Sequence, residues 1–158
     1  MQTKPTPAGA LLAFCFMLVV PVLAAQPQTP ARTEPGSPAI NGYSPVSYFT
    51  EGRPERGDPA FAVRHDERTW FFTSEAQRDL FRADPEKYLP RYAELCPYNL
   101  VLGRTQPIDP TRFRIVGGQL LLFHSSEGTD GLELWKKSPL SEAELMRRAD
   151  ARFELLSF

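Results

Sequence analysis

The order of predicted elements constrains the fold of this chain more than any other feature of its sequence. Two stretches rich in aromatic and β-branched residues read as β-hairpins, and each is followed by a helical pattern. The arms are residues 61–64 and 69–73 in the first hairpin, and residues 112–116 and 119–124 in the second. This order predicts an α+β fold, in which a small antiparallel sheet of two hairpins carries short helices and a C-terminal helix.

Capping signals place the starts of the helices. Ser74 and Gln77 are spaced as a capping box, in which the hydroxyl accepts from the Gln77 amide and the Gln77 side chain reaches back. Pro85, after Asp84, predicts a second short helix. A further capping box at Ser141 starts the C-terminal helix. The aromatic residues of the first hairpin are expected to pack on the first of these helices.

Other segments are less regular. Residues 43–48 favour a short strand or turn, and residues 100–102 favour the end of a strand. The polar segment 125–131 is expected to be a mobile loop. Gly117-Gly118 is a strong two-residue turn signal between the arms of the second hairpin.

The first 39 residues are not expected to contribute to the folded core. Residues 1–25 have the layout of a secretory signal peptide, with an apolar run from residue 9 to 22 and small residues before Gln26. Residues 26–39 are rich in proline and read as a linker. The sequence thus predicts a periplasmic or secreted protein with its domain at residues 40–158 and no stable membrane span after cleavage.

Charge and cysteine content exclude several classes of function. The formal net charge is −1, which argues against nucleic acid as a partner because phosphate backbones are bound by clustered Lys and Arg. Cleavage after residue 25 would remove Cys15 and leave Cys96 as the sole thiol. An unpaired thiol in an oxidising compartment must be buried, pair with another molecule or bind a metal.

Three blocks of sequence, residues 42–61, 69–96 and 103–122, resemble the YHS domain family, most of all its secreted bacterial single-domain branch. The resemblance extends from about Ile40 to Trp135. Its strongest part comprises Phe71, Phe72, Ser74, Phe81, Asp84, Pro85 and Tyr88. The resemblance implies a small binding module associated with metal ions, notably copper.

The resemblance does not carry over every metal ligand. Where the metal-binding branch has two cysteines at the start of the helix, this chain has Thr73 and Gln77. A hydroxyl and an amide are poor ligands for soft or borderline ions. Cys96 stands where the secreted branch keeps a cysteine, although the glycines that precede it there are replaced by Ala93 and Glu94.

Cys96 and His124 are therefore the candidate metal ligands, because thiolate and imidazole suit copper and zinc. Two residues do not close a four-coordinate site, so Met146 or a carboxylate such as Glu94 would have to complete it. We expect Cys96 to be partly buried. His65, in a charged hairpin turn, is interpreted as a solvated surface residue.

The sequence predicts an exported, non-catalytic YHS-like binding module of the bacterial envelope, with copper or zinc as the candidate ligand. Two alternatives stay open. One is an envelope thiol-redox protein or enzyme that uses Cys96, and the other is a degenerate family member that binds an envelope protein. The sequence contains no Gly-x-Ser-x-Gly or His-Glu-x-x-His motif and no phosphate-binding loop, so no specific enzyme class is indicated.

Overall fold

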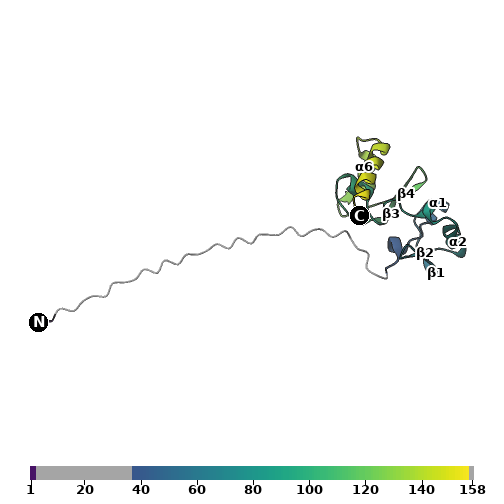
Figure 1. Cartoon of the computed structure of the whole chain (residues 1–158), viewed down its shortest axis with the longest axis horizontal. Coiled ribbons are helices and arrows are strands. Elements are labelled where there is room, and N and C mark those ends of the chain that lie inside the picture. The colour runs from purple at the N-terminus through teal and green to yellow at the C-terminus, as the bar shows by residue number, and fades with distance from the viewer. Residues whose placement is uncertain (3–36, 157–158) are drawn as a thin grey trace.

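The computed structural model describes residues 1–2 and 37–156. Residues 3–25 of the predicted signal peptide and most of the predicted linker lie outside the described residues. The chain forms an α+β fold with three separate two-stranded antiparallel sheets and short helices (Figure 1). The strands are β1 Asp58–His65, β2 Arg68–Phe72, β3 Asp109–Val116, β4 Gln119–Phe123, β5 Ser125–Ser126 and β6 Thr129–Asp130. The helices are η1 Ala39–Gly42, α1 Ser47–Thr50, α2 Glu75–Ala83, α3 Pro85–Tyr88, α4 Pro97–Val101, α5 Gly131–Lys137 and α6 Glu142–Glu154.

The first hairpin forms as predicted, and its tip is a tight turn. His65 at the end of β1 pairs with Arg68 at the start of β2, so Asp66 and Glu67 alone connect the strands. Both connecting residues have positive φ, 46° and 61°. This is the backbone twist that two-residue hairpins favour, although glycine or asparagine is the usual occupant of such positions.

Helix α2 starts at its predicted cap and covers the first hairpin. The Ser74 hydroxyl accepts a hydrogen bond from the Gln77 amide. The Gln77 side chain does not complete the capping box, since its oxygen accepts from the hydroxyl of Ser44 at 2.6 Å. Phe81 is fully buried, with ring centroids 5.0 Å from Phe72 and 5.8 Å from Trp70, which confirms the predicted aromatic packing.

Strand β4 is buried on both faces and separates two hydrophobic clusters. Leu120 and Leu122 pack in the cluster of the first hairpin and α2. Leu121 and Phe123 pack in the cluster of α4, α5 and α6. Because side chains alternate along a strand, the uninterrupted apolar run of β4 fits a position between two cores. Figure 1 shows β3 and β4 between the part that contains β1, β2 and α2 and the part that contains α6.

Three sequence predictions are wrong in detail. The residues predicted as a strand or turn near Tyr48 contain the single helical turn α1. The predicted strand end at residues 100–102 falls in and after α4, whose first residue, Pro97, has a φ already suited to a helix. The predicted mobile loop 125–131 is mostly a short hairpin, β5–β6, with Gly128 at positive φ in its turn.

Two helices complete the fold. Helix α5 was not expected, and its cap is Asp130, whose carboxylate accepts from the amides of Leu132 and Glu133. Helix α6 begins as predicted after Ser141, whose side chain accepts from the Glu144 amide.

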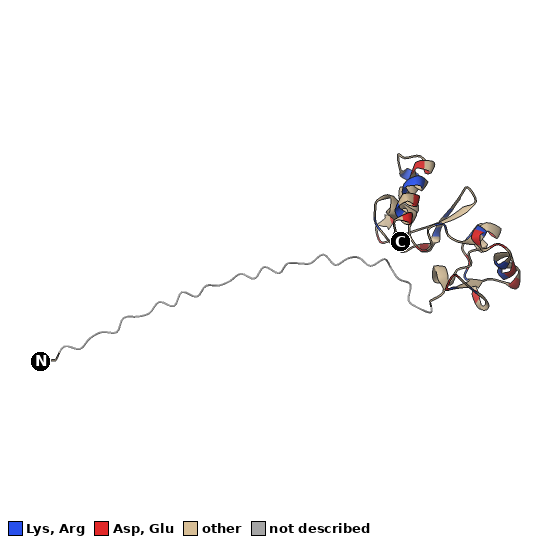
Figure 2. Ribbon diagram, in the orientation of Figure 1, with Lys and Arg blue, Asp and Glu red and all other residues tan. Residues whose placement is uncertain are grey.

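Basic and acidic residues are interspersed along the helices (Figure 2). Within the described part of the chain, no helix is both long enough and apolar enough to cross a membrane.

Candidate functional site

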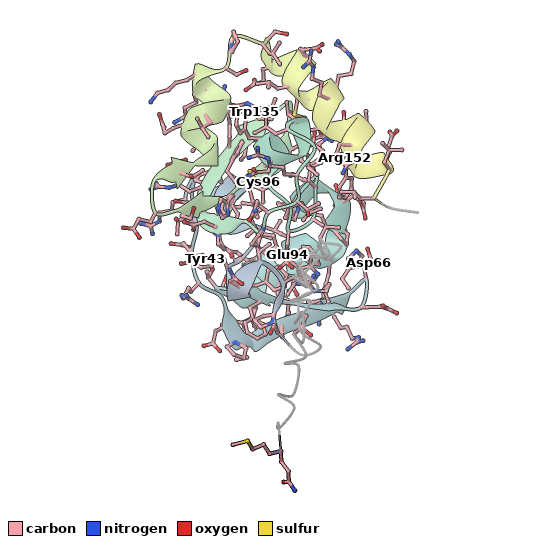
Figure 3. The ribbon with its side chains drawn as sticks, turned by 90° about the vertical axis from the view of Figure 1, so that its left-hand side faces the viewer. Tyr43, Asp66, Glu94, Cys96, Trp135 and Arg152 are labelled. Carbon is pink, nitrogen blue, oxygen red and sulfur yellow. The ribbon has the colours of Figure 1, made fainter. Side chains whose placement is uncertain are left out.

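Cys96 lies inside the second cluster, which corrects the expectation of partial burial. Its residue is fully buried, among Tyr92, Leu100 and Phe123. Figure 3 places it among side chains in the middle of the molecule. A Cβ on Gly131 would stand 3.0 Å from the Cys96 sulfur, so the thiol is packed directly against the backbone of α5. The geometry is that of a small hydrophobic residue in a closed core.

The backbone of His124 also packs against Gly131, but its ring is hydrogen-bonded to other residues. The His124 carbonyl accepts from the Gly131 amide at 2.8 Å. Its Nδ1 lies 2.9 Å from the carbonyl oxygen of Pro107, and its Nε2 lies 3.1 Å from the hydroxyl of Ser126. Since a carbonyl only accepts, Nδ1 carries the proton and Nε2 accepts from Ser126 in the neutral ring. A metal ion at Nε2 would have to displace Ser126.

Thr73 and Gln77, which the resemblance aligns with the cysteines of metal-binding YHS domains, take part in structural hydrogen bonds. The Gln77 side-chain oxygen also lies 3.4 Å from the amide of Thr73, besides accepting from Ser44. Gln77 and Ser44 are both buried. These contacts connect the start of α2 to the segment before α1, and they offer no thiolate or imidazole to an ion.

Glu94, which the sequence offered as a further metal ligand, has structural partners. One of its carboxylate oxygens accepts from the Ile40 amide at 2.6 Å. The other lies 2.8 Å from the guanidinium of Arg68. The residue thus connects the beginning of the domain to strand β2, and its place near the first hairpin can be followed in Figure 3.

A cavity of about 220 Å³ opens beside the Arg68–Glu94 ion pair. Its apolar wall includes Trp70, Leu89 and Pro90, and Asp66 lies at its polar side. Apolar walls with a few charged groups are typical of small-ligand sites.

A second group of potential metal ligands lies next to this cavity, at the tip of the first hairpin. One ligand atom each from His65, Asp66 and Glu86 falls within 4.8 Å of the other two. We call these three residues the hairpin-tip cluster. Among residues 37–156 it is the one group of three or more His, Cys, Asp or Glu side chains close enough to share an ion. Asp66 belongs to both the cluster and the cavity.

The sequence interpretation of His65 as a solvated residue is wrong. Its side chain is 27% exposed, and the ring packs edge-on against Phe81 with centroids 5.6 Å apart. Its Nε2 is buried and makes no hydrogen bond, although the carboxylate of Asp66 lies 3.3 Å away. In the sequence, the adjacent His65 and Asp66 at a hairpin tip could have indicated this cluster. The third member, Glu86, could not be assigned to it because it comes from another element.

No family model matches the chain, and no curated protein or solved structure does so either.

Proposed function

We propose that the domain is an exported, non-catalytic YHS-like binding module of the bacterial envelope, with a copper or zinc ion as its ligand. The proposal draws on the resemblance of residues 42–61, 69–96 and 103–122 to the YHS family. It also draws on the secretory layout of residues 1–25. Both are properties of the sequence.

The observation that favours binding over catalysis is the burial of Cys96. The exposure of this residue is 0%, and its sulfur packs against Gly131. A catalytic or redox thiol must be reached by its substrate, and reactive cysteines lie in partly exposed, electropositive surroundings. Cys96 has apolar neighbours, so the alternative of a thiol-redox protein or enzyme would require the core to open first.

Two sets of potential metal ligands can be compared within residues 37–156. Cys96 and His124, predicted from the sequence, both lie beside Gly131, but both ring nitrogens of His124 are hydrogen-bonded. The hairpin-tip cluster instead has a buried imidazole nitrogen without a hydrogen bond. Binding of a protein partner is the remaining alternative.

A thiol-reactivity assay tests the non-catalytic part of the proposal. In the mature chain from Gln26 onward, Cys96 is the only cysteine. We expect a disulfide-exchange reagent to label folded protein at least about 100-fold more slowly than protein in denaturant, because labelling must await opening of the core. Rapid, complete labelling of the folded protein would contradict the proposal and favour the thiol-redox alternative. A circular-dichroism spectrum recorded in parallel shows that the protein is folded during labelling.

A further inference from the structure

We infer that the hairpin-tip cluster of His65, Asp66 and Glu86 is a binding site for a borderline divalent cation, with Zn²⁺ as its natural probe. This inference rests on the proposed metal-binding function and gives it a location other than Cys96 and His124. Two ligands bound tetrahedrally to zinc at its usual bond lengths stand ~3.4 Å apart. His65 Nε2 and the Asp66 carboxylate oxygen are 3.3 Å apart.

The third ligand comes from a different element and needs only side-chain movement. A Glu86 carboxylate oxygen lies within 4.8 Å of one ring nitrogen of His65 and one carboxylate oxygen of Asp66. Glu86 is exposed, in the first turn of α3, so its side chain can rotate toward an ion without moving the core. The neighbouring cation on α3, Lys87, has its ammonium over the ring of Tyr88, 5.1 Å from the centroid.

The position of the His65 ring suits it to bind an ion from the buried side of the cluster. The edge-on contact with Phe81 orients its ring, and the Nε2 atom is buried without a hydrogen-bond partner. A buried polar atom without a partner costs free energy, which an ion bound there would recover. The exposed carboxylates of Asp66 and Glu86 then form the outer side of the site.

The donor set selects the class of metal. One imidazole nitrogen and two carboxylate oxygens suit Zn²⁺ or Cu²⁺, whereas Cu⁺ prefers sulfur and Mg²⁺ prefers an octahedral shell of oxygens. Three protein ligands leave the fourth position of a tetrahedral ion to water. The site is therefore expected to bind zinc more weakly than a closed structural site.

Because the chain has only two histidines, NMR signals can show directly which of them binds the ion. In a proton–nitrogen correlation spectrum of the mature chain, Zn²⁺ should shift the imidazole signals of His65 and leave those of His124 in place. The variant His65→Gln assigns the two sets of signals. Mg²⁺ at the same concentration should shift neither set. A shift confined to His124 would overturn the inference.

Affinity measurements with charge-neutralising variants provide the second test. In calorimetric titrations with Zn²⁺, Glu86→Gln should weaken binding about tenfold or more, equivalent to at least ~1.4 kcal/mol. The matched control is Glu75→Gln, an exposed carboxylate of α2 whose nearest charged partner is Arg78 at 3.4 Å. This control should bind zinc as the wild type does. Glu86→Gln changes an exposed side chain, so it tests the site even if His65→Gln disturbs the fold.

The outcomes separate this inference from the proposed function. If Glu86→Gln and His65→Gln bind like wild type while Cys96→Ala loses binding, the location is wrong but the metal-binding function stands. If the wild-type chain binds neither zinc nor copper, both are wrong. Loss of affinity in both cluster variants, with Cys96→Ala and His124→Gln unchanged, is the result that the structure predicts.

Discussion

At the tip of the first hairpin, two ordinary residues occupy backbone conformations that usually belong to glycine. Asp66 and Glu67 have φ values of 46° and 61°. The second hairpin has Gly117 and Gly118 at the equivalent turn, with φ values of 56° and 79°. A left-handed conformation costs an L-residue roughly 1–2 kcal/mol. The first hairpin therefore keeps a carboxylate beside His65 at some expense in stability.

Replacing Glu67, which is not part of the hairpin-tip cluster, should recover part of this cost in folding free energy. We expect Glu67→Gly to stabilise the domain by about 0.5–1 kcal/mol, because glycine adopts positive φ freely but loses more entropy on folding. Urea unfolding measures the change as a higher midpoint with an unchanged slope. Gly118→Ala is the opposite control and should lower the midpoint. A lower midpoint for Glu67→Gly would show that the turn is not strained.

At the scale of single elements, the sequence predicted what local interactions determine. Both hairpins and the starts of α2 and α6 follow from alternation, turn residues and caps that act within a few positions. The short helices α1 and α4 were missed because each is too short to show a helical period in the sequence. Packing against the rest of the chain stabilises them. Asp130, the N-cap of α5, could have been recognised in the sequence as a capping residue, but residues 125–131 were interpreted as a loop.

Helix α6 is held to the rest of the domain by a cluster of polar contacts that no local pattern indicates. The Asp150 carboxylate accepts from the Arg91 guanidinium at 2.8 and 2.9 Å, and from the hydroxyl of Tyr92 at 2.8 Å. Burial favours the neutral acid, but the hydrogen bonds from Arg91 and Tyr92 outweigh it and lower the pKa of Asp150. Burial, together with the nearby Asp150 charge, raises the pKa of Tyr92.

Asp150→Asn should destabilise the domain by about 1–2 kcal/mol near neutral pH, since a charge-assisted pair is lost at a partly exposed position. The lowered pKa means that Asp150 stabilises the fold above the ordinary carboxyl pKa of about 3.9, and that this contribution is lost as the pH falls below it. The stability difference between wild type and variant should therefore shrink toward about pH 3.

Urea unfolding at several pH values measures this difference. Asp79→Asn, which removes an exposed ion-pairing carboxylate on α2, should change stability by less than about 1 kcal/mol at any of them. If Asp150→Asn lowered the free energy of unfolding by the same amount at acidic and at neutral pH, the assigned role of the Asp150 charge would be contradicted.

At the scale of the whole molecule, the candidate site depends on contacts that the sequence does not reveal. His65 and Glu86 are on different elements, and a T-shaped contact with Phe81 of α2 orients the imidazole. The sequence instead favoured Cys96, because it is the one cysteine after the predicted cleavage site. Strand β4 places Leu121 and Phe123 in the same cluster as that thiol, and this burial could not be read from the residues around it.

We propose that the domain binds a metal ion outside its core. The decisive measurement is the metal content of the chain from Gln26 onward, purified without chelators and determined by elemental mass spectrometry. We expect about one zinc or copper ion per chain, retained in Cys96→Ala and depleted in Glu86→Gln. Protein that is folded but contains neither metal, and that takes up neither on titration, would contradict the claim.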